Sequence, residues 1–336
     1  MIRAAIVGLG AWGKTLVDAV HDQNDAIRFT RACTRTPDKV ADYCRERGLQ
    51  LGARYEDILS DRNIDAVVLA TPNSQHETQI KQAAVTGKHV YVEKPFTLTL
   101  GSARAAVDMV RRARVTLAVG HNRRFHPNMI ELTERVRSGR LGTIGSMICD
   151  LTAATGFHRP ESSWRTLPQE EPAGAMVSIG VHLVDAMMNM AGRVREVYCV
   201  TSNRGGPRGD DTTNLMLQFE SGVTGMIYCS VAAARYHRTA VYGTKGFAEV
   251  LKPRMEVFRF IPIVDSNASH LAQIPEPEVI EVSGFNYVGQ SLTEFARCIR
   301  EGAPYPISTE DIVHEAAVLE AAIQSAASGK PVQVSD

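Results

Sequence analysis

The first 120 residues alternate between short apolar runs and longer stretches with helical spacing. The runs "IRAAIV", "AIRFTRAC", "DAVVLA", "HVYVE" and "VTLAVG" are rich in β-branched residues. Runs that are apolar on both faces predict strands of a parallel sheet that is covered on both sides. Segments such as "PDKVADYCRERG" and "SQHETQIKQAAVTG" supply the helices between them. The pattern predicts a doubly wound α/β domain over residues 1–120.

The pattern changes over residues 121–336, where a second domain is expected. After a helix in "PNMIELTERVRSG" and a strand in "IGSMICDLTA", apolar and polar residues alternate in "TTNLMLQFE", "VTGMIYCSVA" and "HRTAVYG". This alternation predicts antiparallel strands. Two helices follow, in "NYVGQSLTEFARCIREG" and in residues 309–329, where Gly329 is the expected C-cap. The second domain is predicted to be α+β with an open, mostly antiparallel sheet, and the last helices could pack back on the first domain.

Composition narrows the class of partner. The chain has 37 basic and 37 acidic residues among its 336, and it has no basic run interleaved with aromatic residues. Nucleic acid is therefore not an expected partner, and a small molecule is. The first apolar run ends early in glycines, too soon for a signal peptide or a membrane span. The six scattered cysteines form no CxxC pair and no zinc-ligand pattern, which indicates a soluble cytoplasmic protein without a metal site.

A glycine-rich turn follows the first predicted strand and precedes a helix. In "GLGAWG", Gly8 permits a tight turn, Gly10 lets the backbone approach a pyrophosphate, and Gly13 allows close helix packing. The helix N-terminus offers N–H groups to the anion. We therefore predict dinucleotide binding by Gly8, Leu9, Gly10, Ala11, Trp12 and Gly13.

The end of the second predicted strand indicates which dinucleotide binds. An acidic residue is expected about 20 residues after the last glycine if the ribose 2′-hydroxyl is bound. This chain has Thr34 and Arg35 there instead. A hydroxyl beside a guanidinium suits a 2′-phosphate, which favours NADP, with NAD possible. The alternative is that Arg35 is a solvated charge or stacks on adenine.

Two further loops follow strands at the edge of the sheet where ligands of open α/β folds bind. They contain "ATPNSQH" and "VEKP". Lys94 would otherwise be an ordinary surface charge, but it stands between a strand end and Pro95, whose peptide bond is a candidate for the cis form. The predicted cofactor-binding residues of these loops are Ala70, Thr71, Pro72, Asn73, His76, Glu93, Lys94 and Pro95.

The apolar stretch "PAGAMVSIGVHLVD" carries one histidine, His182. A lone histidine on an apolar helix is more often a satisfied core residue than a catalyst. If the stretch is an α-helix, however, Ser178, His182 and Asp185 share one face, so that a hydroxyl and a carboxylate can approach the imidazole. Asp185 could orient the ring or make only a structural contact.

Several motifs together resemble the glucose-fructose oxidoreductase, inositol dehydrogenase and MocA family (Gfo/Idh/MocA). They are "GLGAWG", "ATPNSQH", "EKP", "VGHNRRF", "SGRLGTIG", "WR", "AGAMVSIGVHLVD" and the closing segment from "EGAPYPISTEDIV" onward. The resemblance covers nearly the whole chain. It implies an N-terminal Rossmann domain, a C-terminal domain with a large open sheet, and hydride transfer between a nicotinamide and usually a sugar or cyclitol.

The resemblance also implies roles for single residues. The lysine of the family's EKP motif falls on Lys94, its substrate-binding arginine on Arg123 and its catalytic histidine on His182. Many members carry an aspartate four residues before that histidine, where this chain has Ser178. The predicted catalytic residues are Lys94 and His182, with Ser178 and Asp185 as possible support, and the predicted substrate-binding residues are Asn122, Arg123, Trp164, Arg165 and His182.

Three functions are compatible with these residues. The first is an NAD(P)-dependent oxidoreductase acting on a CH–OH group of a carbohydrate-like substrate. The second is a cofactor-assisted glycoside hydrolase or lyase, and the third is a noncatalytic, dinucleotide-sensing protein. The presence of both Lys94 and His182 argues against the third.

The predicted open sheet suggests an assembly. Leu215, Leu217 and Phe219 share one face of their strand, and Asn214, Met216 and Gln218 share the other, which Met226, Tyr228 and Tyr242 are expected to join. A surface of methionine, tyrosine and amide side chains suits a protein partner better than water. We therefore expect a homodimer or homotetramer, the alternative being an ordinary exposed sheet.

Overall fold

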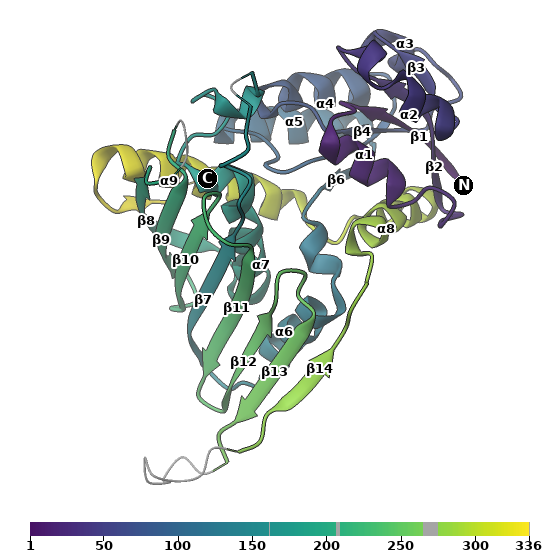
Figure 1. Ribbon diagram of the computed structural model, residues 1–336. Coiled ribbons are helices and arrows are strands. Elements are labelled where there is room, and N and C mark those ends of the chain that lie inside the picture. The colour runs from purple at the N-terminus through teal and green to yellow at the C-terminus, as the bar shows by residue number, and fades with distance from the viewer. Residues whose placement is uncertain (161, 206–208, 265–274, 336) are drawn as a thin grey trace. The chain divides into compact units, whose positions relative to one another are not determined.

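The computed structural model describes residues 1–160, 162–205, 209–264 and 275–335 (Figure 1). The chain divides into two compact units. The first consists of Met1–Asn122 together with Asn286–Ala316, and the other described residues make up the second. Helix α8 (Tyr287–Glu301) therefore belongs to the first unit, and helix α9 (Thr309–Ser328) begins in the first unit and ends in the second.

The first unit is built on a six-stranded sheet in the order β3-β2-β1-β4-β5-β6. All its strand pairs are parallel, which confirms the predicted doubly wound sheet. The order reverses beside β1, between β1 and β4, and ligands of such sheets bind at this point. The strands are β1 (Ile2–Val7), β2 (Ile27–Cys33), β3 (Gln50–Gly52), β4 (Ala66–Leu69), β5 (His89–Val92) and β6 (Leu117–Val119).

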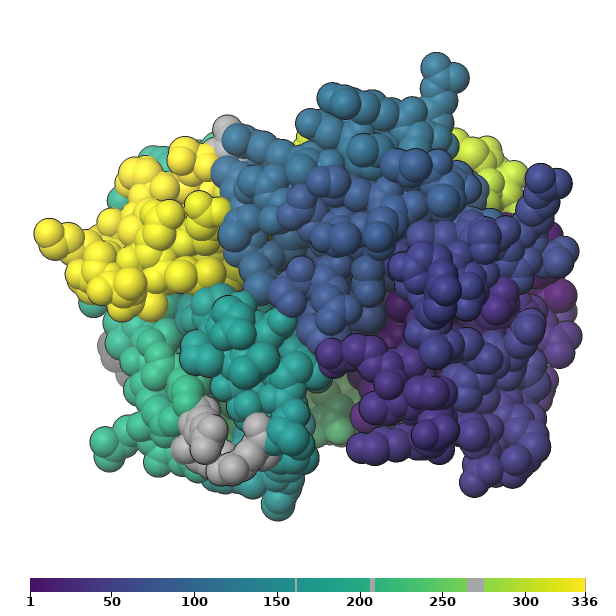
Figure 2. Space-filling view, turned by 90° about the horizontal axis from the view of Figure 1, so that it is seen from above, coloured from purple at the N-terminus to yellow at the C-terminus, as the bar shows by residue number. Residues whose placement is uncertain are grey.

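Helices cover the sheet of the first unit, and residues 1–122, purple to blue, form a continuous surface in Figure 2. The helices of this unit are α1 (Ala11–Asp18), α2 (Ala41–Glu46), α3 (Tyr55–Leu59), α4 (His76–Val85), α5 (Leu100–Ala113) and α8. The late helix α8 packs on β2 and β5. Its Phe295 ring meets the Tyr91 ring edge to face at 5.8 Å, and its Ser291 hydroxyl lies 3.0 Å from the Tyr91 hydroxyl. These buried contacts account for the place of α8 in the first unit.

The second unit is built on a nine-stranded sheet in the order β14-β13-β12-β11-β7-β10-β9-β8-β15. In the described chain β7 and β10 run parallel and the other pairs of this sheet are antiparallel, so the predicted large, mostly antiparallel sheet is confirmed. The strands are β7 (Ile144–Thr152), β8 (Val194–Ser202), β9 (Thr212–Phe219), β10 (Thr224–Ser230), β11 (Tyr236–Gly243), β12 (Gly246–Leu251), β13 (Val257–Pro262), β14 (Glu278–Glu281) and β15 (Val332–Gln333).

The two faces of this sheet differ in what they contact. Helix α6 (Pro127–Arg137) packs on β12 and β13, and helix α7 (Val181–Ala191) packs on β7 (Figure 1). Along β9 the burial alternates as the sequence predicts, because Leu215, Leu217 and Phe219 are buried while Asn214, Met216 and Gln218 are exposed. Met226 of β10 lies opposite Met216. The two methionines are 51% and 58% exposed, so the sheet presents apolar side chains on its open face.

All six cysteines are buried free thiols. Cys33, Cys44 and Cys298 belong to the first unit, and Cys149, Cys199 and Cys229 to the second. Burial raises the pKa of each of the three in the second unit to about 12 and that of Cys298 to about 11. No helix of the described chain is long and apolar enough to cross a membrane.

Candidate active site

The glycine-rich turn joins β1 to α1 in the first unit. Gly8 has φ +93°, and a Cβ there would lie 2.4 Å from the Ala70 carbonyl oxygen. A Cβ on Gly13 would lie 2.1 Å from the Gly8 carbonyl oxygen. Around Gly10, by contrast, no atom of the described chain apart from its neighbours comes within 4 Å of such a Cβ. The turn therefore fits a dinucleotide, since Gly8 and Gly13 allow close packing and Gly10 leaves open space at the α1 N-terminus.

The carboxyl end of β2 lies next to that of β1. Thr34 and Arg35 follow β2 directly, and Arg35 is exposed. Arg31, within the strand, pairs instead with Asp61 at 2.8 Å. This edge therefore offers a hydroxyl and an exposed guanidinium beside the glycine turn.

His76 connects the loops that follow β4 and β5. Its Nδ1 lies 3.0 Å from the Pro95 carbonyl oxygen and 3.2 Å from that of Phe96, and its Nε2 lies 3.2 Å from the Thr71 carbonyl oxygen. The ring is fully buried. These contacts give His76 a positioning role for the two loops, and its predicted contact with a cofactor stays a prediction. The cis Lys94–Pro95 bond is confirmed.

Glu93 is a buried carboxyl group beside Lys94. Burial raises its pKa, and a hydrogen bond from Trp12 opposes this effect. A Cβ on Gly120, after β6, would lie 2.7 Å from Glu93 Oε1, so Gly120 leaves room for this carboxyl. Glu93 thus joins the glycine turn to the end of β5, where half-buried Lys94 follows.

In the second unit, the segment before His182 is not the uniform α-helix we expected. Residues Met176–Gly180 form a π-helical turn, η5, which continues directly into α7. A π-turn bonds residues five apart, so the α-helical spacing that would place Ser178, His182 and Asp185 on one face does not apply to Ser178. Gly180 accompanies this turn, because a Cβ there would lie 2.9 Å from Met176 Sδ and 3.0 Å from Cys229 Sγ.

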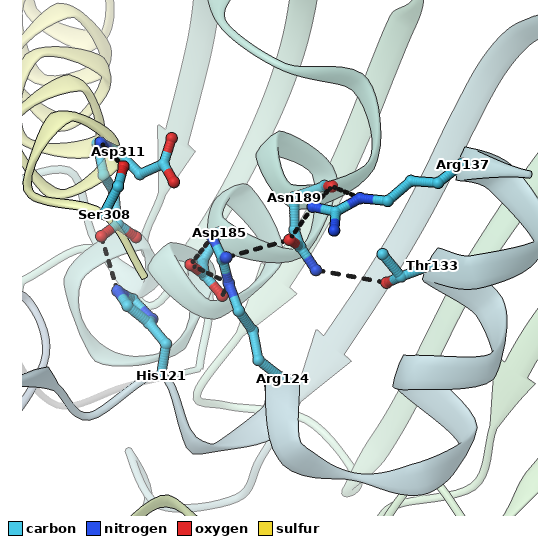
Figure 3. Close-up of polar contacts among 9 residues, drawn as sticks. His121, Arg124, Thr133, Arg137, Asp185, Asn189, Ser308 and Asp311 are labelled. Carbon is cyan, nitrogen blue, oxygen red and sulfur yellow. Dashed lines mark hydrogen bonds and ion pairs between the residues drawn. The ribbon is translucent and has the colours of Figure 1, made fainter. Parts of the chain in front are cut away.

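Asp185 of α7 forms a buried ion pair. Arg124 Nε lies 2.9 Å from both of its carboxylate oxygens, and Arg124 Nη2 lies 2.7 Å from Oδ1 (Figure 3). Arg124 Nη1 and Arg137 Nη2 also donate to Asn189 Oδ1, at 3.1 and 2.7 Å. These contacts tie α7 to the segment around Arg124 and to α6, and they favour the structural alternative for Asp185.

Arg123 lies against a buried histidine of β11. Its Nη1 is 3.2 Å from His237 Nδ1. Burial lowers the pKa of His237 well below its usual value, and the charges of Arg123 and His126 lower it further. A neutral imidazole can accept from the guanidinium at Nδ1 only with its proton on Nε2, which faces Thr239 Oγ1 at 3.4 Å. Arg123 therefore donates a hydrogen bond to the neutral His237 ring.

The carboxylate of Glu171 lies beside three residues that the sequence predicted for the site, which are Ser178, Trp164 and Arg165. Ser178 Oγ donates to Glu171 Oε1 at 2.5 Å, and Arg165 Nε lies 3.5 Å from the same oxygen. The Arg165 guanidinium stacks on the Trp164 ring at 4.1 Å. Arg159 Nη1 donates to Glu171 Oε2 at 2.6 Å. Glu171 thus links Ser178 to the Trp164–Arg165 pair.

The sequence predicted no role for Arg124, Arg159, Glu171 or His237. Arg124 stands beside Arg123 in "HNRRF", and Glu171 lies close before the His182 segment in "QEEPAGAM". Neither position carries a pattern that separates it from a surface charge. The predicted Asn122 is 3% exposed and follows β6 in the first unit, whereas Arg123 begins the second.

Comparisons with known proteins agree with this architecture. Residues 2–121 match the family model described as an oxidoreductase family with an NAD-binding Rossmann fold, and residues 129–249 match the GFO/IDH/MocA C-terminal domain. The scyllo-inositol 2-dehydrogenase (NAD(+)) of Bacillus subtilis is 28% identical, over 99% of this chain and 96% of the relative. The D-xylose 1-dehydrogenase (NADP(+)) 2 of Haloferax volcanii is 25% identical, over 97% of each chain.

A solved structure shows the same fold. Levoglucosan dehydrogenase, in complex with NADH and L-sorbose, superposes with a TM-score of 0.88 at 21% identity and covers 100% of this chain and 99% of its own. The two family models, read with the parallel sheet and the glycine turn, confirm the expected enzyme class. The chain belongs to the GFO/IDH/MocA family and is an NAD(P)-binding oxidoreductase.

Proposed function

We propose that the chain is a dehydrogenase or reductase that acts on a CH–OH group of a sugar, cyclitol or related polar molecule. The observation that carries this proposal is the glycine turn at the point where the strand order reverses, with open space at Gly10. The substrate class is supported by the names of the relatives, which are an inositol dehydrogenase and a xylose dehydrogenase.

The proposed mechanism places two side chains at the reacting oxygen of the substrate. When bound, the nicotinamide supplies the hydride acceptor or donor. His182 exchanges the proton of the substrate hydroxyl, and Lys94 hydrogen-bonds and polarises the same oxygen. Arg123, hydrogen-bonded to His237, binds the substrate together with Asn122, Trp164 and Arg165.

A panel of substrates tests the proposal. D-glucose, D-xylose, myo-inositol and scyllo-inositol are each offered with NAD and with NADP, and absorbance of the reduced nicotinamide is followed. Oxidation of at least one polyol is the expected result. A glycoside is added to the panel, and its cleavage by the NAD(H)-bound protein without net redox change would favour the hydrolase or lyase alternative. Cofactor binding without any turnover would favour a sensing protein.

We also propose that NADP(H) binds more tightly than NAD(H). A charge-assisted contact between Arg35 and the extra phosphate contributes about 1.5 to 3 kcal/mol, on the order of 10- to 150-fold in affinity. Arg35→Ala should therefore weaken NADP much more than NAD, as measured by fluorescence titration of the reduced cofactors. Arg45→Ala, at a side chain that is 76% exposed on α2, is the matched control and should change neither affinity. Equal losses for both cofactors in Arg35→Ala would contradict the proposal.

We further propose that the chain forms a homodimer or homotetramer in which the open face of the nine-stranded sheet is buried between copies of the chain. It carries Met216, Met226 and Tyr228, each more than a third exposed. Light scattering at micromolar concentration should report the mass of at least two chains, and Met226→Glu should shift it toward one chain, because a carboxylate is costly to bury. Val85→Glu, at an exposed residue of the first unit, is the control and should keep the parent mass. A monomeric parent protein would refute the assembly.

A further inference from the structure

The sheet order of the first unit indicates which strands face the nicotinamide half of the cofactor. The pyrophosphate is expected at the glycine turn after β1, and the adenosine ribose at the end of β2, on one side of β1. The other half of the dinucleotide then extends to the opposite side, across the carboxyl ends of β4, β5 and β6. Polar side chains that follow β5 and β6 are therefore candidates to bind it.

Two buried polar atoms at these strand ends make no hydrogen bond within the described chain. They are Oε1 of Glu93, directly after β5, and Nδ2 of Asn122, the third residue after β6. The two residues are 5% and 3% exposed. Buried polar groups without a partner are rare in folded proteins, because each has lost its hydrogen bonds to water. A bound molecule is therefore expected to supply the two missing partners.

The two atoms belong to neighbouring strand ends. Strands β5 and β6 pair in parallel, with Val92 opposite Val119. A Cβ on Gly120, the first residue after β6, would lie 2.7 to 2.9 Å from three atoms of the Glu93 carboxyl, so this carboxyl rests on the glycine. Asn122 is two residues further along, and two residues of chain span at most about 7 Å. The Glu93 oxygen and the Asn122 nitrogen thus lie in one small region at the edge of the sheet.

The two atoms are chemically complementary rather than alike. Burial works against the ionised form of Glu93, whereas hydrogen bonds from the Trp12 side chain and the Lys94 backbone N–H favour it. An ionised carboxylate only accepts hydrogen bonds, and the amide nitrogen of Asn122 only donates them. The missing molecule must therefore offer one donor and one acceptor close together.

The nicotinamide ring carries such a pair of groups in its carboxamide, an N–H donor beside a carbonyl acceptor. Pyrophosphate, ribose and nicotinamide follow one another in the dinucleotide, as β1, β4, β5 and β6 follow one another across the sheet. The ribose hydroxyls next to the pyrophosphate are therefore expected nearer to β4. The carboxamide, at the far end of the cofactor, is expected nearer to β5 and β6.

We propose that Glu93 and Asn122 bind the carboxamide of the nicotinamide. Glu93 Oε1 accepts a hydrogen bond from the carboxamide N–H, and Asn122 Nδ2 donates one to the carbonyl oxygen. This contact engages the nitrogen of Asn122, so its amide oxygen can still make the substrate contact proposed above. The inference rests on the binding of a dinucleotide and not on the oxidation of a polyol.

Cofactor analogues that are altered at the carboxamide provide the test. In 3-acetylpyridine adenine dinucleotide a methyl group replaces the carboxamide nitrogen, and in nicotinic acid adenine dinucleotide a carboxylate replaces the carboxamide. Isothermal titration calorimetry on the full chain measures Kd for NAD and both analogues, or for their 2′-phosphorylated forms if the parent prefers NADP. The acetylpyridine analogue should bind at least about 10-fold more weakly than the natural cofactor, because Glu93 loses its donor. The nicotinic acid analogue should bind more weakly still, because two carboxylates then face each other.

A gain of affinity separates this role of Glu93 from a structural one. Glu93→Gln keeps the size of the side chain but adds an N–H donor and removes the charge. The variant should bind the nicotinic acid analogue at least about 10-fold more tightly than the parent does, because an amide can donate to its carboxylate. Glu310→Gln, at a carboxylate of the same unit that is 66% exposed, is the matched control and should change none of the three Kd values.

Asn122→Ala tests the other half of the contact. It should weaken the natural cofactor and the acetylpyridine analogue by similar factors of about 5- to 10-fold, because both carry the carbonyl oxygen. The preference for the carboxamide over the acetyl group should stay as in the parent. Asn63→Ala, at an exposed asparagine of the first unit, is the control and should bind all three molecules as the parent does.

The proposal is overturned if the parent binds the acetylpyridine analogue as tightly as the natural cofactor, which is the result expected if water alone bonds to the two atoms. It is also overturned if Glu93→Gln gains no affinity for the nicotinic acid analogue, or if Asn122→Ala changes no Kd. Circular dichroism checks the folding of each variant. If a variant does not fold, the parent alone decides. Affinity that falls in the order carboxamide, acetyl, carboxylate supports the proposal, and any other order overturns it.

Failure of the dehydrogenase proposal gives a different result. A parent protein that shows the expected order of affinities but oxidises no polyol supports the carboxamide contact and contradicts the proposed substrate class. A parent that oxidises a polyol but binds the acetylpyridine analogue as tightly as the natural cofactor contradicts only the carboxamide contact.

Discussion

Replacing His182 with alanine should lower turnover by about 10²- to 10⁴-fold, because a positioned acid–base group typically contributes on the order of 3 to 5 kcal/mol to the transition state. Lys94→Ala should cause a loss of similar size, since it removes the group proposed to polarise the substrate oxygen. The measurement is kcat on the best polyol of the panel. Both variants must first be shown to fold and to bind the cofactor as the parent does.

A matched histidine variant makes this result specific. His158 is exposed and belongs to the same unit as His182, so His158→Ala should keep the parent turnover. If His182→Ala also keeps it, the ring is a structural histidine of an apolar helix. That outcome would remove the proposed proton exchange and leave the assignment of the family unchanged.

Replacing Asp185 with alanine should lower the free energy of unfolding by about 3 to 5 kcal/mol. The variant leaves the Arg124 guanidinium, only 10% exposed, without the carboxylate that contacts it at 2.7 and 2.9 Å. Breaking a buried ion pair on one side costs this much because the remaining charge is uncompensated. Urea unfolding followed by circular dichroism measures the change.

The control for Asp185→Ala is a substitution in a solvent-exposed ion pair of the same protein. Asp42 and Arg45 of α2 are 82% and 76% exposed at a separation of 2.7 Å, and Asp42→Ala should cost less than about 1 kcal/mol. Similar losses for the two variants would contradict the buried character of the Arg124–Asp185 pair.

The parts of the fold that the sequence predicted are those with a strong local pattern. Strands β1, β4 and β5 are short, apolar and buried at almost every position, and β9 alternates residue by residue. Strand β3 was not predicted, because it has three residues at the edge of its sheet and none is buried. Short edge strands depend on a neighbour rather than on their own pattern.

The candidate site could be predicted only where a motif marks a position. The glycine turn and the cis Lys94–Pro95 bond are local features and were found. The pairing of Arg123 with His237 spans 114 positions, and that of Arg124 with Asp185 spans 61, so neither leaves a local signal.

The departure from the family pattern at Ser178 shows the same limit. Where many members of the family carry an aspartate, this chain has Ser178. A carboxylate nevertheless lies beside this position, because Glu171, seven residues earlier, accepts a hydrogen bond from the Ser178 hydroxyl. The π-turn that carries Ser178 also breaks the α-helical spacing on which our prediction of one shared face relied. Both features arise from packing between segments rather than from the periodicity of one.

The six buried thiols can report on the unfolding of the segments that contain them. A thiol-labelling reagent reacts with a cysteine only when its sulfur is accessible and ionised to the thiolate. Burial in the native state makes the sulfur inaccessible and disfavours the thiolate. Labelling therefore requires local or global unfolding, and its rate follows the free energy of the opening that exposes each sulfur. Because each unit holds three of the cysteines, mass spectrometry of the labelled peptides can follow the stability of the two units separately, without any engineered probe.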